Sequence, residues 1–336
     1  MSVSMHPTLQ KRFASFTDLT PIEFHALWGH SDAQFLEGRM LHSLILNQPQ
    51  YWLSIPDRTL AGLWTFGPKI HGRVQETTLL TMIDDVTGEL AYHVYLATQT
   101  DNKYIGFTVN LRMDKHTNVG AVAREFYFEA RAVDVEGRKV GVECRVFDAR
   151  TSAVLMTARA MFVFMSFAQI SKRSANTQSV PYEMQPQISS SCDIDTDLRG
   201  LDRVMNFLPP NTVTHSNGSL NTHTRTLVVG LDFGPNISGP PIYVHGGILA
   251  TVLYNASELL FAKSLGVEDD LINASVRDVN YYKGVPLECR NVTIDASVET
   301  QDEKQVVVFA KLMQGPHVFT TLKTTFTLQS STSSKL

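Results

Sequence analysis

The chain has 336 residues, of which 43% are hydrophobic and 18% are charged, with a formal net charge of −4. This is the composition of a globular protein long enough for two domains with ordinary cores. It lacks the basic footprint of a nucleic-acid-binding protein, and no apolar run approaches the roughly 20 residues that a membrane span needs. The three cysteines, Cys144, Cys192 and Cys289, fit neither a metal spacing nor a disulfide framework, which suits a reducing compartment. We expect no metal and no other cofactor.

Residues 1–56 are expected to form a helical extension that covers the first domain. Thr20-Pro21-Ile22-Glu23 has the order of an N-cap, an N1 proline and a first-turn acid, which predicts the start of a helix. Gln34 to Leu46 is a second helical stretch, interrupted by Gly38. No chemistry is assigned to this extension.

Residues 57–168 are predicted to form the first domain, a long helix followed by antiparallel strands. Val74 to Val86 is compatible with a helix. The runs that follow are β-branched and partly alternating, which is typical of strands. These runs are Tyr104–Met113, Ala123–Val133, Lys139–Phe147 and Ala153–Phe164.

Residues 223–329 are predicted to form a second domain of the same order. Leu227 to Phe233 is strand-like, Gly234 to Pro241 is a loop, and Ile248 to Lys263 favours a helix because it contains neither glycine nor proline. Four further strand-like runs follow the helix. They are Ala274–Tyr282, Val292–Val298, Gln305–Met313 and Val318–Leu328.

A repeat relates the two halves. Leu63 to Pro68 matches Gly230 to Pro235, and a helix-compatible stretch follows each segment. Self-similarity about 170 residues apart indicates a duplicated unit. Residues 169–222, between the copies, are rich in Ser, Asn, Gln and Pro and are expected to be a linker, and residues 330–336 are expected to be a polar tail.

His245-Gly246-Gly247 stands where the loop of the second half becomes a helix. The first N–H groups of a helix have no partner within it, and the macrodipole adds positive charge there. Glycine admits a ligand close to this backbone, since it has no Cβ. The segment therefore suits an anion, or a carbonyl oxygen that gains charge during a reaction. A tight turn without a ligand is the alternative.

This segment resembles the start of the central helix in hotdog-fold acyl-CoA thioesterases, where His-Gly-Gly precedes a helix of small and apolar residues. Thr81 to Gly88 resembles the carboxylate-bearing helix of the same superfamily, in its phenylacetyl-CoA and 4-hydroxybenzoyl-CoA thioesterase-like branch. The resemblance implies an α+β fold, a tandem (double) hotdog in which each half is a long helix wrapped by a curved antiparallel sheet. It also implies hydrolysis of acyl-CoA thioesters.

The two halves complement each other where the resemblance places the chemistry. Family members carry an Asp or Glu nine residues after the His, and that place holds Tyr254 in the second half. The first half has Asp84 there, but Gln75-Glu76-Thr77 in place of His-Gly-Gly. The resemblance therefore implies one composite site, in which the Gly246 and Gly247 amides hold the carbonyl oxygen. Asp84 would act as general base or as nucleophile, and the sequence does not choose between these roles.

Four neighbouring residues are candidates for contact with the substrate or the attacking water. Thr87, near Asp84 on the same helix, is a candidate to orient the water, and Asn236 to hold it from the glycine side. Asp85 is a further candidate beside Asp84, although solvated helix charges are the alternative for both carboxylates. His245 is expected to be a structural hydrogen-bonding residue, because the proposed hydrolysis leaves it no proton to transfer.

A second register between the halves stays open. If His71-Gly72-Arg73 stands for His-Gly-Gly, then Asp84 lies thirteen residues on, which is about one helical turn further. Glu258 lies at the same distance from the second-half histidine, so both acids become candidates. We prefer the first register, because it aligns the Met-Ile-Asp segment. Whether a second pseudo-site, formed by Gln75, Glu76 and Thr77 with Tyr254 and Glu258, is active also stays open.

Two other functions are weighed against hydrolysis. A non-catalytic acyl-CoA-binding or scaffold protein would result if duplication left both sites damaged, as the missing acid at Tyr254 favours. A hotdog-type enoyl-CoA hydratase needs an Asp and a His a few residues apart in a loop-helix motif. Asp114-Lys115-His116 and Asp278 offer no such arrangement.

The resemblance places the acyl chain in a tunnel between the halves and the CoA phosphates near surface cations. Lys103, Arg112 and Lys283 are candidate cations, with a solvated surface position as the alternative for each. The sequence determines neither the acyl chain length nor whether two chains pair into a homo-oligomer.

Ser334-Lys335-Leu336 follows a polar, serine-rich stretch. In a terminal position this tripeptide is an address read by a receptor for import into peroxisomes. We therefore expect a peroxisomal location and an interaction of Ser334, Lys335 and Leu336 with the import receptor. Fatty acyl-CoA is handled in that compartment, which agrees with the resemblance.

Overall fold

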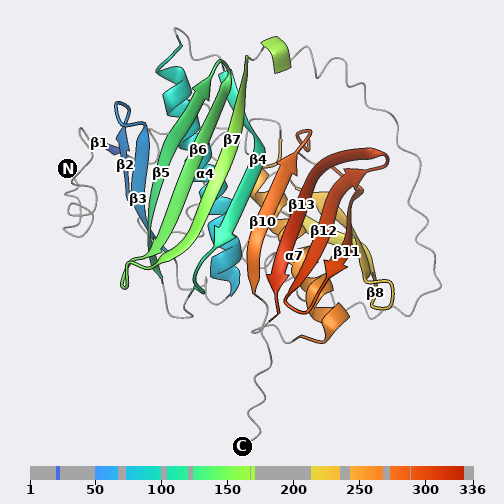
Figure 1. Cartoon of the computed structure of the whole chain (residues 1–336). Coiled ribbons are helices and arrows are strands. Elements are labelled where there is room, and N and C mark those ends of the chain that lie inside the picture. Colours follow the sequence, from blue (N-terminus) through green and yellow to red (C-terminus); the bar gives the residue numbers. More distant parts are fainter. Residues whose placement is uncertain are drawn as a thin grey trace, which may run out of the picture. The chain divides into compact units, whose positions relative to one another are not determined.

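Two compact units make up the chain, residues 1–111 with 116–180 and residues 112–115 with 181–336 (Figure 1). The structure is a computed structural model. It describes residues 20–22, 50–66, 73–99, 104–119, 124–166, 168–170, 213–234, 243–267, 273–287 and 289–328.

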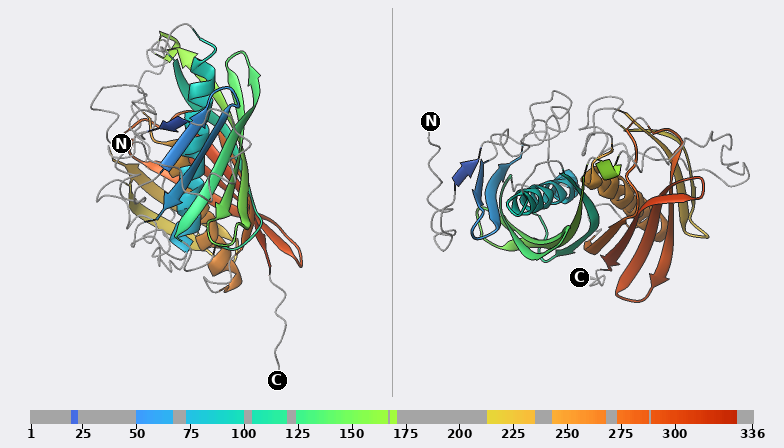
Figure 2. Two further views of the ribbon diagram at one scale, coloured as in Figure 1. Left: turned by 90° about the vertical axis from the view of Figure 1, so that its left-hand side faces the viewer. Right: turned by 90° about the horizontal axis from the view of Figure 1, so that it is seen from above.

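The first unit places one long helix, α4 (Arg73–Leu96), against a sheet in the order β1-β2-β3-β5-β6-β7-β4. Seen from above, the sheet curves around the helix (Figure 2). The strands are β1 (Thr20–Ile22), β2 (Gln50–Ser54), β3 (Thr59–Thr65), β4 (Tyr104–Lys115), β5 (Glu125–Glu136), β6 (Lys139–Asp148) and β7 (Val154–Ser166).

The second unit places α7 (Gly246–Leu265) against a sheet in the order β10-β13-β12-β11-β9-β8. Each neighbouring pair in this sheet is antiparallel. The strands are β8 (Val213–Asn221), β9 (Thr226–Phe233), β10 (Ala274–Tyr281), β11 (Val292–Gln301), β12 (Gln305–Gln314) and β13 (His317–Thr327).

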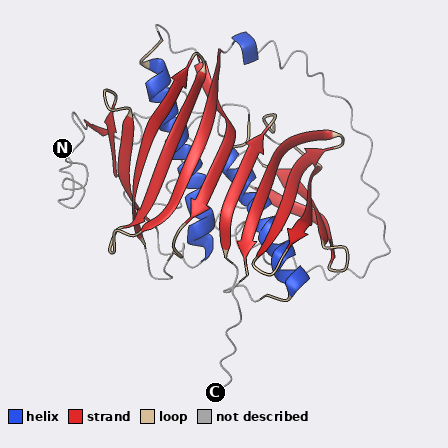
Figure 3. Ribbon diagram, viewed as in Figure 1, coloured by secondary structure: helices blue, strands red, loops and turns tan. Residues whose placement is uncertain are grey.

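The two units repeat one strand order. β2-β3-β5-β6-β7-β4 in the first corresponds to β8-β9-β11-β12-β13-β10 in the second, and in each the long helix joins the second strand of that series to the last. Figure 3 shows this combination of one long helix with antiparallel strands in both units. The sequence repeat between residues 63–68 and 230–235 therefore marks the corresponding strands β3 and β9.

Both long helices are buried around their whole circumference. Residues 78–87 of α4 and 247–257 of α7 are buried without exception. A helix of this kind needs apolar cover on every side, and the inward residues of the strands provide much of it. Burial alternates along β9 and β12, as expected for strands with one face on a core.

Stacked aromatic rings join helix to sheet in each unit. The rings of Tyr95 on α4 and Phe164 on β7 lie 4.2 Å apart, and those of Phe261 on α7 and Phe326 on β13 lie 4.3 Å apart. β7 and β13 hold corresponding places in the two sheets, so the same kind of contact anchors the C-terminal part of each helix.

The sequence correctly predicted both long helices and the strands that follow them, with most boundaries within a few residues; the exception is the C-terminal end of α4, at Leu96 instead of Val86. The prediction of a helix at Thr20-Pro21-Ile22-Glu23 is wrong, because residues 20–22 form β1 at the edge of the first sheet. An edge position accommodates Pro21, since its missing N–H interrupts no ladder on the outer side. The second expected helix, Gln34–Leu46, lies outside the described residues.

The predicted linker 169–222 is wrong at its C-terminal end, where β8 pairs with β9. A polar turn joins the two strands, and the Asn221 side chain accepts hydrogen bonds there from the N–H groups of His223 and Thr224. β8 is polar because it is an edge strand, so its composition matched that of a linker. Strand β2 similarly lies within the range 1–56 that was expected to be helical.

Replacing Gly62 on β3 by alanine is expected to lower the free energy of unfolding by about 1–3 kcal/mol. The new Cβ would lie 2.4 Å from both the Gln50 carbonyl oxygen and the Phe128 ring. The first of these is backbone, and Phe128 is stacked on Trp64, so neither moves easily. Equilibrium urea denaturation measures the effect. Gly141→Ala, whose nearest new contacts are at 3.2 Å, is the control, and equal losses in both variants would contradict the prediction.

Candidate active site

His245 caps the N-terminus of α7. Its Nδ1 accepts a hydrogen bond from the Gly247 N–H at 3.0 Å, and its carbonyl oxygen accepts from the N–H groups of Ile248 and Leu249. The side chain thus takes the part of a capping residue at this helix start. The expectation that His245 is a structural hydrogen-bonding residue agrees with this geometry. The Gly247 amide, assigned to the substrate oxygen from the sequence, donates to His245 in this structure.

The start of α7 is held by contacts with the chain around Val285. Val244 N–H donates to the Val285 carbonyl at 2.8 Å, and the Tyr281 hydroxyl donates to the Gly246 carbonyl at 3.0 Å. Gly284 lies against the Tyr243 ring so closely that a Cβ there would approach it to 2.5 Å. The N-terminal amides of α7 therefore have a fixed direction, which a preorganised oxyanion site requires.

Asp84 lies in the buried middle of α4 and is 4% exposed. Thr108 of β4 donates a hydrogen bond from its hydroxyl to Asp84 Oδ1 at 3.0 Å. A buried carboxylate needs such donors, because it has lost its water. This pair joins the helix to the last strand of the first sheet.

Thr108 is the functional candidate that sequence reasoning missed. It stands within an ordinary strand-like run, 24 residues after Asp84. Only a search for a hydroxyl on the strand after the acid-bearing helix would have selected it. The pairing itself depends on how α4 crosses β4, which a one-dimensional pattern does not contain.

The other two candidates on α4 have different surroundings. Thr87 is buried and donates from its hydroxyl to the carbonyls of Ile83 and Asp84, at 2.7 and 3.1 Å, so its hydrogen is used within its own helix. Asp85 is 8% exposed and lies near Tyr51. Burial is the main cause that raises the pKa of Tyr51, and the charge of Asp85 adds to it. The alternative of solvated helix charges is therefore wrong for both aspartates.

Tyr254 occupies the corresponding place on α7 and forms a different polar group. It is 1% exposed, and its hydroxyl donates to Glu258 Oε1 at 2.6 Å and accepts from Arg277 Nη2 at 2.8 Å. The Arg277 guanidinium also lies over the Tyr254 ring, 4.3 Å from its centroid. Arg277 is itself 1% exposed. A phenol and a guanidinium thus stand where the first unit has a carboxylate and a hydroxyl.

These contacts favour the first of the two registers between the halves. Asp84 binds β4 and Tyr254 binds β10, and both strands hold the last place of the common strand order. α4 has 24 residues and α7 has 20, and with Asp84 opposite Tyr254 most of the extra length falls at the N-terminus of α4. Gln75, Glu76 and Thr77 consequently lie inside a helix, whereas His71 and Gly72 lie outside the described residues.

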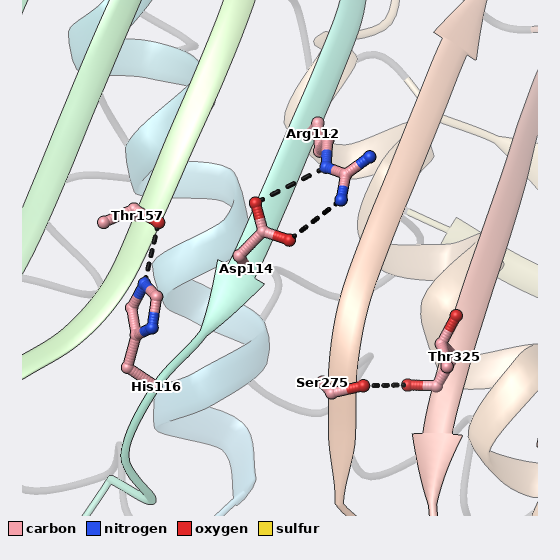
Figure 4. A network of polar contacts seen from close by, with 6 residues as sticks. All are labelled: Arg112, Asp114, His116, Thr157, Ser275 and Thr325. Carbon is pink, nitrogen blue, oxygen red and sulfur yellow. Dashed lines mark hydrogen bonds and ion pairs between the residues drawn. The ribbon is translucent and has the colours of Figure 1, made fainter. Parts of the chain in front are cut away.

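The remaining candidates give no further support for the site. Asn236 and Lys103 lie outside the described residues, and Lys283 is exposed. Arg112 forms an ion pair with Asp114 at 3.2 Å, while the His116 ring meets the Thr157 hydroxyl at 2.8 Å (Figure 4). Asp114 and His116 thus bind different residues instead of forming a shared Asp–His pair, so the structure gives no support to a hydratase site. Figure 4 also shows Ser275, which donates to the Thr325 carbonyl between β10 and β13.

No helix in the described part of the chain has the length and apolar character needed to cross a membrane. Within the same ranges, no three His, Cys, Asp or Glu side chains are grouped so that they could hold a metal ion.

No protein-family model and no curated protein matches the sequence. Solved structures match in fold. The tesB protein from Mycobacterium avium subspecies paratuberculosis has a TM-score of 0.54 at 10% identity, over 87% of this chain and 99% of its own. The acyl-CoA thioesterase II TesB2 from Mycobacterium marinum has a TM-score of 0.50 at 9% identity, over 88% of this chain and 100% of its own. This chain therefore has the fold of the hotdog thioesterases.

Replacing Tyr254 by phenylalanine is expected to lower the free energy of unfolding by about 1–3 kcal/mol. The change leaves the ring in place but removes the hydroxyl that joins Arg277 to Glu258. Thermal or urea denaturation of the purified chain measures it. Tyr282→Phe is the matched control, because Tyr282 is 62% exposed and its hydroxyl contact is 3.4 Å long. A Tyr254→Phe variant as stable as this control would contradict the buried network.

Proposed function

We propose that the protein is an acyl-CoA thioesterase built as a tandem double hotdog. The observation that carries the proposal is the buried Asp84 carboxylate held by the Thr108 hydroxyl, in a chain with the fold of tesB thioesterases. A buried acid at the middle of a helix is costly for stability, so such groups are concentrated at functional sites.

Hydrolysis of a thioester fits the groups available. Asp84 takes a proton from a water that attacks the carbonyl carbon, and the CoA thiolate leaves. Alternatively, Asp84 attacks that carbon itself, the thiolate leaves, and water then hydrolyses the mixed anhydride to release the acid. The carbonyl oxygen gains negative charge in the transition state. N–H groups at the start of α7 stabilise it, and one such donor contributes about 3 kcal/mol in comparable sites. Because the Gly247 N–H donates to His245, the proposal assigns this contact first to the Gly246 N–H.

The two units contribute different halves of this chemistry. The first has the carboxylate and its hydroxyl partner, while Gln75, Glu76 and Thr77 lie within its helix. The second has the glycine-rich helix start, with Tyr254 in place of the acid. The proposal therefore joins Asp84 with the amides of Gly246 and Gly247 in one composite site and leaves the second pseudo-site without hydrolytic activity.

Fatty acyl-CoA is the proposed substrate, and Mycobacterium marinum TesB2, which shares the fold, is named an acyl-CoA thioesterase. A hydrolysis screen over short, medium and long acyl-CoAs, followed through the released thiol, tests the activity and its chain-length preference. Binding of acyl-CoA without turnover at any length would instead support the non-catalytic binding protein. The Gly247–His245 hydrogen bond and the absence of an acid at Tyr254 are the observations that favour that second candidate.

Replacing Asp84 by asparagine is expected to lower kcat by at least roughly 100-fold, since the amide can neither take a proton nor attack. Thr108→Val is expected to lower it roughly tenfold, because the carboxylate loses a hydrogen bond that orients it. Both variants should bind acyl-CoA almost as well as the parent. Glu143→Gln on the exposed side of β6 is the control and should keep full activity. Unchanged kcat in Asp84→Asn would refute the assignment of the acid.

We further propose that Ser334-Lys335-Leu336 directs the protein to peroxisomes through the import receptor. A fluorescent protein fused before residue 1 should give punctate staining that coincides with a peroxisomal marker. Deleting residues 334–336 should make the staining diffuse, because the receptor reads the terminal tripeptide. Diffuse staining of the full chain would refute the proposed location without affecting the proposed activity.

A further inference from the structure

A second acidic group on α4 is separate from Asp84 and has no part in the proposed hydrolysis. Asp85, Glu89 and His93 follow one another at intervals of four residues, so they share one face of the helix. Glu89 is 3% exposed and Asp85 is 8% exposed. Two carboxylates one turn apart are therefore buried together, which low-dielectric surroundings make unfavourable when both are ionised.

His93 and Tyr51 complete this group. Glu89 Oε1 lies 2.8 Å from His93 Nε2, and the His93 side chain is 23% exposed, so the histidine lies between the buried acid and solvent. Tyr51 comes from β2, and the charges of both acids raise its pKa, after the larger effect of its burial. The face of α4 that carries Asp85, Glu89 and His93 is thus turned toward the β2–β3 hairpin.

The other strands against α4 leave this group few titratable neighbours. The buried residues of β5, β6 and β7 are apolar apart from Tyr127 and Cys144. Tyr127 packs in a separate cluster with Trp52, and burial raises the pKa of the Cys144 thiol, which keeps it neutral. On α4 itself, Tyr92 also faces Glu89, whose charge adds to the effect of burial on the Tyr92 pKa.

We propose that Asp85, Glu89, His93 and Tyr51 form a proton-sensitive latch between α4 and the β2–β3 hairpin. The latch is closed while Glu89 is protonated and therefore neutral. Loss of that proton leaves two buried carboxylates one turn apart beside Tyr51, and their repulsion loosens the hairpin from the helix. The proposal concerns the stability of the first unit and does not depend on the thioesterase activity.

The direction of the pH dependence follows from the Glu89 carboxyl. Burial is the main cause that raises its pKa from 4.5 to about 7, against the opposing effect of His93. Between these two values the folded state holds a proton that the unfolded state has released. The stabilising contribution is therefore complete below about pH 4.5 and is lost as the pH rises through about 7.

Replacing Glu89 by glutamine tests the latch in the full chain. The equilibrium constant for unfolding in urea is measured at pH 5 and at pH 8 for both proteins. Its rise between these pH values should be roughly 10- to 100-fold larger in the parent than in Glu89→Gln. Glu143→Gln, an exposed carboxylate on β6, is the matched control and should keep the pH dependence of the parent. The same pH dependence in Glu89→Gln as in the parent would overturn the proposal.

A second variant keeps the test decisive if Glu89→Gln does not fold. Asp85→Asn removes the charge that repels the ionised Glu89 and helps to raise its pKa, so the midpoint of the pH dependence should move to lower pH. Trp64 on β3 reports on the hairpin, and a variant with Trp28 and Trp52 replaced by phenylalanine isolates its fluorescence. In this Trp64-only variant with Glu89 and Asp85 retained, the emission should shift between pH 6 and pH 8, roughly around the pKa of the Glu89 carboxyl. The absence of a shift in Trp64 emission, or an unchanged midpoint in Asp85→Asn, would overturn the latch. A failure of the proposed acyl-CoA hydrolysis is a separate result, because the latch concerns only stability.

Discussion

A helix that is buried on every side leaves its polar side chains no water to bind, so a polar side chain there is stabilised by a partner inside the protein. α4 and α7 are both in this position over their middle turns. The sheet that curves around each helix supplies apolar cover from most strands. It also supplies a hydroxyl partner for Asp84 and a guanidinium partner for Tyr254. The arrangement of the polar groups in this protein follows from that constraint.

The two units meet the constraint differently at corresponding positions. In the first, the Asp84 carboxylate accepts a hydrogen bond from Thr108 on the last strand of the order. In the second, Tyr254 takes the place of the acid, and Arg277 and Glu258 satisfy its hydroxyl. A phenol enclosed by a cation and an acid has both its donor and its acceptor function occupied. Corresponding positions of the two units therefore carry a carboxylate in the first and a phenol in the second.

The first unit also buries three ionisable side chains on α4, and they face different strands. Asp84, Asp85 and Glu89 lie within six positions of one buried helix, which no requirement of folding explains. Asp84 faces β4 and the proposed chemistry. Asp85 and Glu89 face the β2–β3 hairpin, where the raised pKa of Glu89 couples proton binding to the packing of the helix. One helix thus carries two polar groups, to which we assign different roles: the proposed reaction for Asp84 and the proposed pH-dependent stability for Asp85 and Glu89.

Period and composition were enough to predict the elements. An uninterrupted run with good helix formers predicted α7, alternating β-branched runs predicted the strands, and the repeat of residues 63–68 at 230–235 predicted two similar units. The glycine-rich helix start was singled out from its place between a loop and a helix, and Asp84 from the resemblance of its segment to the carboxylate-bearing helix of hotdog thioesterases. Local patterns contain this information, since helix and strand periodicity act over a few neighbouring residues.

Tertiary structure decided the partners. Thr108 as the donor to Asp84, the Arg277–Tyr254 contact and the engagement of the Gly247 amide by His245 depend on how a helix crosses a strand or how a cap closes. β1, which is short and contains Pro21, was mistaken for a helix, and β8, which is polar, for a linker; pairing with a neighbour stabilises both edge strands more than their own propensity does. Side-chain partners lie far apart in the chain and close together only after folding, so no spacing in the sequence specifies them.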